Sequence, residues 1–125
     1  MCLCTKEKDP KIAEGDIITY KIIASKKNVY YTPYRDYIIQ FNIRLEDIIE
    51  EDIKYLFNVY MIESGYFHSY TDLESAKKEL LKLKKKMPKN IELKIYDSII
   101  PKGTPYYIGM RSDICSKSII IKEDD

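Results

Sequence analysis

The stretch from Thr71 to Pro88, TDLESAKKELLKLKKKMP, predicts an amphipathic helix. Its apolar residues recur every three or four positions, which places them on one helix face. Thr71 and Glu74 have the spacing of a capping box, in which each side chain satisfies the other residue's exposed amide. Lysines crowd the final turns, where cations complement the helix dipole, and Pro88 ends the helix because it has no backbone N–H.

The residues before this helix predict a second helix and three strands. Between Leu45 and Tyr60 the apolar side chains again follow helical spacing, and acidic residues fill the first half, where carboxylates favour the dipole. Gly65 follows that predicted helix, and Tyr66–Tyr70 then forms a short strand. Earlier in the chain, β-branched and aromatic residues predict strands at Asp16–Ala24 and Tyr37–Phe41.

The residues after Pro88 predict three more strands. The alternation from Ile91 to Ile95 is typical of a half-buried strand. It continues to a turn at Pro101–Thr104, in which Gly103 supplies a positive φ. Tyr106–Ile108 and Ser118–Ile121 form the last two strands. We therefore expect an α+β protein with a mainly antiparallel sheet of five to six strands and two helices.

The chain of 125 residues has the length of one domain. We expect a single α+β domain over residues 16–122, a loosely ordered lead-in over 1–15 and a frayed acidic tail over 123–125. No stretch approaches the ~20 apolar residues of a membrane span, and the charged N-terminus is unlike a secretory signal. We therefore expect no membrane partner and a cytoplasmic location.

Charge balance argues against nucleic acid as the partner. Twenty-one basic and twenty acidic residues leave a formal net charge of +1, whereas proteins that neutralise phosphates usually carry a basic excess. A nucleic-acid role would need a local basic patch. The lysines of the Thr71–Pro88 helix make such a face, but a solvated surface beside the acidic predicted helix is the simpler interpretation.

Cysteine usage argues against a disulfide framework and a metal site. The three cysteines are an odd number. Cys2 and Cys4 would need both Cys115 and His68 to complete a tetrahedral site. Free thiols in a reducing compartment are the simpler interpretation, and we expect neither a metal nor another cofactor.

Four segments together resemble a family of small uncharacterised proteins common in gut Bacteroidales and their phages. The resemblance covers nearly the whole chain. It implies a phage or mobile-element setting, and the host cytoplasm for a phage-encoded protein, without implying an activity. The segments are MCLCT at 1–5, PKIAE running into DIITYK at 10–21, GYFHSY at 65–70, and IIPKGTPYY at 99–107 closing on SKSII at 116–120.

A weaker, outline similarity points to ADP-ribosyltransferase-like domains. A Gly-x-x-x-Ser segment before a capped helix, and then a strand running into Pro-x-Gly-Thr at 101–104, resembles the layout of these domains. The similarity implies a catalytic carboxylate at Asp97 and a first-strand position near Tyr20 or Lys21. The chain departs from the family pattern, because Asp97 replaces one glutamate and Ile95 the other.

The candidate site residues are an aromatic cluster and two titratable groups. His68 is the only histidine, and its side chain titrates near neutral pH. His68 and Asp97 are the candidate catalytic residues, although a packed histidine is the simpler interpretation of His68. The cluster suits a stacked base or a docked partner, and with His68 it is the candidate ligand or partner surface: Tyr30, Tyr31, Tyr34, Arg35 and Tyr37.

We expect a small binding protein of phage or mobile-element type, whose partner is a host protein or a nucleotide-like ligand. Binding is favoured over catalysis because aromatic residues are plentiful, while no complete acid/base, metal or nucleophile set can be assembled from the sequence. The alternatives are an ADP-ribosyltransferase-like enzyme and a structural or assembly protein. Self-association into a homo-oligomer would favour a structural or assembly protein.

Overall fold

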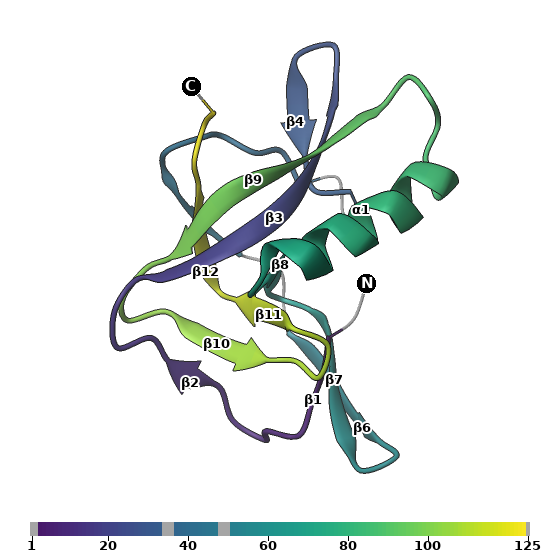
Figure 1. Cartoon of the computed structure of the whole chain (residues 1–125). Helices are drawn as coiled ribbons and strands as arrows, with labels where there is room; N and C mark the ends of the chain where they lie inside the picture. The colour runs from purple at the N-terminus through teal and green to yellow at the C-terminus, as the bar shows by residue number, and fades with distance from the viewer. Residues whose placement is uncertain (1–2, 34–36, 48–50, 125) are drawn as a thin grey trace.

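The computed structural model describes residues 3–33, 37–47 and 51–124, the side chains at 63 and 64 excepted. The described residues form one helix and twelve strands in two sheets (Figure 1). The expectation of two helices and five to six strands is therefore wrong, and the chain is mainly β.

The larger sheet has a long pair of strands at its centre, β3 and β9. They are antiparallel and in continuous register from Ile17 opposite Ile100 to Ser25 opposite Glu92. β4 (Val29–Tyr31) pairs with β3 outside the main order. In spatial order the sheet contains β2 (Lys11–Ile12), β10 (Pro105–Ile108), β11 (Asp113–Ser116), β8 (Phe67–Tyr70), β3 (Ile17–Lys26), β9 (Glu92–Ile100), β12 (Ser118–Ile121) and β5 (Arg44–Glu46).

Both faces of the β3–β9 pair are covered. Ile22 and Ala24 belong to the cluster that includes the buried residues of the helix. Ile23 lies in a second cluster, with Phe67 and Ile119. Neighbouring residues of a strand point to opposite faces, so the continuous apolar run in β3 is the pattern of a strand buried on both sides.

The helix α1, Leu73–Lys86, confirms the prediction for this segment and lies across one face of the larger sheet (Figure 1). Its buried residues are Ala76 and Leu83. The cap differs from the predicted one, because Asp72 instead of Thr71 is the N-cap. The Asp72 carboxylate accepts hydrogen bonds from the backbone N–H of Ser75 at 2.7 Å and from its hydroxyl at 3.0 Å, and these bonds lower the pKa of Asp72.

The predicted helix from Leu45 to Tyr60 is absent from the described residues of that segment. β5 occupies its start, and β6 (Asp52–Leu56) and β7 (Val59–Ser64) form a hairpin that projects from the body (Figure 1). Phe57 and Asn58 form the turn with φ values of 53° and 63°, the positive values that a type I′ hairpin turn needs. Ile48 and Ile49 lie outside the described residues.

Pairing with a strand that is distant in the sequence explains why this segment forms a hairpin and not a helix. β1 (Leu3–Thr5) pairs with β7 and completes the smaller sheet, in the order β1-β7-β6. Leu3 lies opposite Ile62, and both side chains are fully buried. Asp52 to Tyr55 also alternates in polarity, so tertiary pairing decides between two patterns that the same residues satisfy.

Other segments also differ from expectation. The segment over residues 1–15 contributes β1 and β2. Within Tyr37–Phe41 the structure has a single bridge, from Ile38 to Tyr31. β11 forms where a loop was expected. In the acidic tail, Asp124 forms an ion pair with Lys94.

We predict that replacing the turn of the β6–β7 hairpin by Asn-Gly, through Phe57→Asn and Asn58→Gly, raises the free energy of unfolding by about 1 kcal/mol. Glycine accepts a positive φ without the strain that other side chains meet there. Urea denaturation measures the change. The matched control is Lys27→Asn with Asn28→Gly in the β3–β4 turn, where φ is also positive at both positions. If the variant at 57 and 58 alone lowered the free energy of unfolding by about 1 kcal/mol, a helix in this segment would be indicated instead, because glycine destabilises a helix.

Candidate functional site

A hollow of about 350 Å³ lies between α1 and the β8–β11 side of the larger sheet. We call it the helix hollow. α1 contributes four of its lining residues, and the remainder come from β8, from β11 and from the turn between β10 and β11. The lining residues are Tyr70, Ser75, Lys78, Glu79, Lys82, Arg111, Ser112 and Asp113.

Hydrogen bonds hold the β10–β11 turn against the start of α1. The backbone N–H and the hydroxyl of Thr71 both donate to the backbone oxygen of Ser112, at 2.9 and 3.0 Å. The Asp113 carboxylate accepts from the backbone N–H of Arg111 at 3.2 Å. Gly109 permits this arrangement, because a Cβ there would lie 2.0 Å from the Asp113 carboxylate oxygen Oδ1. The turn therefore forms a fixed wall of the hollow.

Three cations give the helix hollow its charge. Lys78, Lys82 and Arg111 are exposed, and none of them forms an ion pair with another described residue. Of the two lining carboxylates, that of Asp113 already accepts a backbone hydrogen bond. Three such cations beside one another favour an anionic ligand.

Only part of this cationic group is visible in the sequence. Lys78 and Lys82 are four residues apart, so a helix places them on the same side. Arg111 is distant in the chain, and only the pairing of β11 with β8 brings it opposite the helix. Without that pairing, no spacing pattern relates Arg111 to the two lysines.

A much smaller cavity adjoins the helix hollow and contains His68. Its volume is about 30 Å³, enough for one or two waters. The two share Tyr70 and Glu79 as lining residues. Lys21 is 5% exposed, and its ammonium donates to the backbone oxygen of His68 at 2.5 Å. His68 therefore has charged neighbours, but this cavity is too small for a nucleotide.

The predicted tyrosine cluster is divided between two packing clusters. Tyr30 and Tyr37 pack with Phe67 and its neighbours on one side of the larger sheet, and the rings of Tyr37 and Phe67 meet edge to face with centroids 5.2 Å apart. Tyr31 packs on the α1 side instead. Tyr34 and Arg35 lie outside the described residues. The described tyrosines of this cluster thus contribute to core packing and do not share one surface.

The predicted catalytic residue Asp97 lies in the larger sheet. It is exposed on β9 and is the cross-strand partner of Tyr20. Neither residue lines any of the hollows described among these residues. Of the residues that the similarity to ADP-ribosyltransferase-like domains implies, Asp97 and Tyr20 therefore lie outside these hollows, whereas Lys21 lines the small cavity that contains His68.

Cys115 is buried in the core. It lies opposite His68 in the register of β11 and β8, but it packs in a cluster with Leu3 and Tyr66. Burial raises the pKa of the Cys115 thiol, so the nucleophilic thiolate is scarce near neutral pH. Cys2 lies outside the described residues, and no three metal-ligating side chains gather in the rest of the chain.

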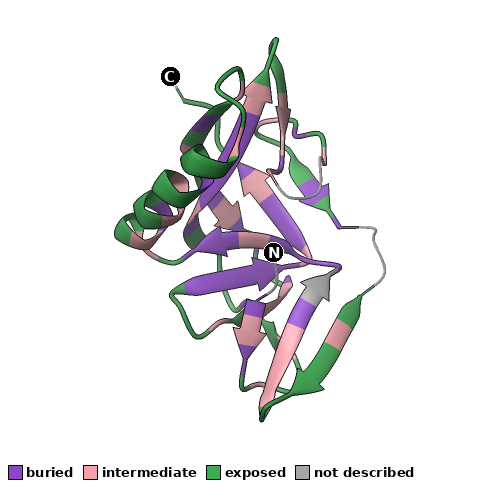
Figure 2. Cartoon of the chain, turned by 90° about the vertical axis from the view of Figure 1, so that its right-hand side faces the viewer, coloured by how far each residue is buried: buried purple, intermediate pink, exposed green. Residues whose placement is uncertain are grey.

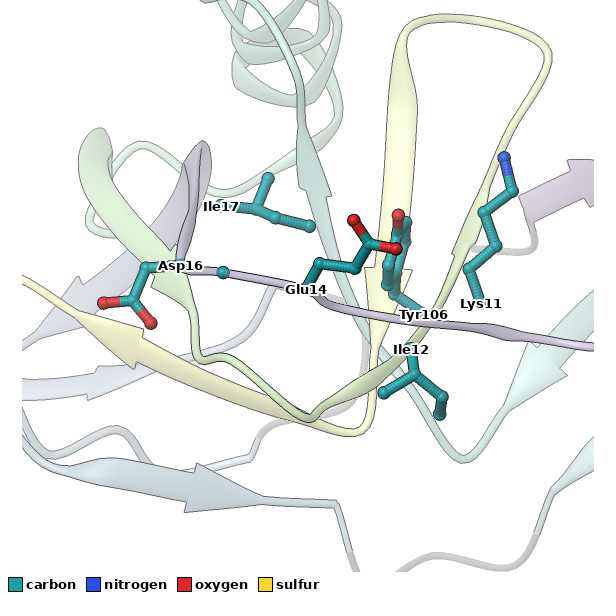
Figure 3. Close-up of a pocket in the computed structure, with 7 residues that line it drawn as sticks. Lys11, Ile12, Glu14, Asp16, Ile17 and Tyr106 are labelled. Atoms are coloured by element: carbon teal, nitrogen blue, oxygen red, sulfur yellow. The ribbon is translucent and has the colours of Figure 1, made fainter.

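A larger hollow, about 510 Å³, lies beside β2 and the start of β3 (Figure 3). Its charged groups have mixed signs and are partly engaged. Lys11 forms an ion pair with Glu7 at 3.4 Å, and the carboxylate of Asp16 accepts from the backbone N–H of Lys102 at 3.0 Å. Figure 3 shows Glu14 directed toward Tyr106 and Asp16 directed elsewhere. This hollow therefore has no excess of cations, whereas the helix hollow has three cations against two carboxylates.

Comparison of the chain with protein-family models, with curated proteins and with solved structures finds no match. In the described part of the chain, no helix has both the length and the apolar character needed to cross a membrane.

We predict that Cys115 resists alkylation in the folded protein. With its pKa raised by burial, the thiol reacts with iodoacetamide at pH 8 only after unfolding. Mass spectrometry of peptides from native and urea-treated protein measures the modification. Cys4, which is partly exposed, is the internal control and reacts in both states. Rapid native labelling of Cys115 would contradict its burial.

Proposed function

We propose that this chain is a small binding protein that holds the phosphate group of a nucleotide-like ligand in the helix hollow. The observation that carries the proposal is the group of three cations around one concave space: Lys78, Lys82 and Arg111. The volume of about 350 Å³ lies within the range of small-molecule sites.

Phosphate suits the polar groups of this hollow. The Arg111 guanidinium offers a planar set of donors that matches phosphate oxygens in pairs. The ammonium groups of Lys78 and Lys82 add point charges across the hollow. Because Arg111 is held by the bonded β10–β11 turn, little of its backbone needs to be ordered on binding.

Binding is proposed in preference to catalysis because of the kinds of side chain that line the hollow. Beside the carboxylates of Glu79 and Asp113, they supply three positive charges whose N–H groups can hold a phosphate, and they include neither a histidine nor a cysteine. His68 lies in the adjoining small cavity. The phage or mobile-element setting and the host cytoplasm rest on the sequence resemblance alone and remain part of the proposal.

We predict that the double variant Lys78→Ala, Lys82→Ala binds ADP at least roughly tenfold more weakly than the unmodified protein. Each charge-assisted hydrogen bond is worth about 1.5 kcal/mol or more, and about 1.4 kcal/mol corresponds to a factor of ten. Isothermal titration calorimetry at low ionic strength measures the affinity. Adenosine, which lacks phosphate, is expected to bind much more weakly than ADP.

The matched control is Lys85→Ala with Lys86→Ala, which removes the same charge from the same helix but outside the hollow. This variant is expected to bind ADP as the unmodified protein does. Absence of ADP binding, or an equal loss in both variants, would contradict a phosphate site in the helix hollow. Circular dichroism checks that each variant keeps its fold.

A further inference from the structure

Positive charge is concentrated on one element of this nearly neutral chain. Residues 73–89, which comprise α1 and the turn after it, contain seven lysines and two glutamates, whereas the whole chain has a formal net charge of only +1. The remainder of the chain is therefore acidic on balance. The outer side of α1 is exposed to solvent (Figure 2), so this local patch is available to a partner.

Four of these lysines form a row on one flank of α1. Their spacing of four, seven and eight residues from the first places them on the same side of a helix. All four are exposed, and none forms an ion pair with another described residue. With a rise of about 1.5 Å per residue the row is roughly 12 Å long. Its members are Lys78, Lys82, Lys85 and Lys86.

The row begins at the helix hollow and is closed at that end. Lys78 and Lys82 belong both to the row and to the hollow. Across the hollow, the wall formed by Arg111 and Ser112 is bonded to Thr71, just before α1. Toward the end of α1, Lys85 and Lys86 continue the row beyond the hollow. A chain of negative charges can therefore terminate in the hollow and follow the helix.

We propose that α1 binds the backbone of a single-stranded nucleic acid, with a terminal phosphate of the strand in the helix hollow. This inference rests on the proposed phosphate site and extends it along the helix. Successive phosphates of one strand lie at least ~3.4 Å apart along the axis of a duplex, and farther apart when the strand is extended. The row therefore spans about two to four phosphates. Contacts of this kind read charge and not base sequence.

Two features favour a single strand over other polyanions. The closed end of the row accepts a strand terminus, which a continuous duplex does not provide. An anionic membrane fits less well, because a membrane-surface helix needs a free apolar face, and the apolar face of α1 is packed on the sheet. The described residues of the segment from Leu45 to Tyr60 also contain β5, β6 and β7 in place of the acidic helix that the sequence predicts beside these lysines.

We predict that short thymidine oligonucleotides with a terminal phosphate bind in a salt-dependent manner. Fluorescence anisotropy of a labelled six-nucleotide strand, measured from low to moderate salt, gives the affinity. The slope of log K against log salt is about −0.7 for each neutralised phosphate of a single strand, so three to four contacts give roughly −2 to −3. Lys85→Ala with Lys86→Ala is expected to reduce the magnitude of the slope by about 1.4. The same variant leaves ADP binding unchanged.

The matched control is Lys77→Ala with Lys84→Ala, which removes two exposed lysines from the other flank of α1. If this control binds the oligonucleotide as the unmodified protein does, the result supports binding along the lysine row. An equal loss of affinity in both variants overturns the inference and indicates general charge attraction. Strands phosphorylated at the 5′ or the 3′ end are compared with unphosphorylated ones. Equal affinity for all three strands overturns the placement of a terminal phosphate in the helix hollow.

The failure of this inference can be distinguished from failure of the phosphate site. ADP binding that depends on Lys78 and Lys82, without oligonucleotide binding, overturns the inference alone. Absence of both activities contradicts the proposed function as well. Binding to vesicles containing phosphatidylserine in preference to the oligonucleotides would assign the lysine row to a membrane surface and overturn the inference.

Discussion

Nine consecutive residue pairs join β3 to β9, and the other large parts of the fold are assembled on this ladder. Its two strands are long and rich in β-branched residues, which suits a pleated surface covered on both faces. One face supports α1 through Ile22, Ala24 and Leu93. The other supports the cluster of Ile23 with Tyr96. β8 and β12 then pair with the outer edges of the ladder and extend the sheet on each side.

This arrangement also produces the candidate site. α1 lies against the ladder by its apolar face, so its lysine-bearing flank stands over β8 and β11. β11 ends at the turn that contains Arg111 and Ser112, and the hydrogen bonds from Thr71 connect this turn to the start of the helix. The cationic hollow is thus a consequence of packing one helix on a sheet beside a tight turn.

The local sequence pattern is sufficient to predict some secondary-structure elements and insufficient to predict others. α1 has an apolar stripe, an N-terminal cap and a terminating proline, and these signals agree with one another. The segment from Leu45 to Tyr60 has both a helical period and, between Asp52 and Tyr55, an alternating one. The acidic residues of that segment indicated a helix, yet β1 supplies a partner strand that buries Ile62 against Leu3. Periodicity within a short stretch of sequence does not reveal a partner strand some sixty residues away in the chain.

The same distinction separates the parts of the site. Composition and spacing established that α1 would carry lysines on a solvent-facing side, because a helix repeats every 3.6 residues whatever its surroundings. They could not place Arg111 opposite Lys78, show that the tyrosines would divide between two packing clusters, or reveal that the Cys115 thiol would be buried. Each of these depends on which strands pair, and strand pairing brings together residues from distant parts of the chain. Helical periodicity is a local property, whereas the site is a product of long-range sheet topology.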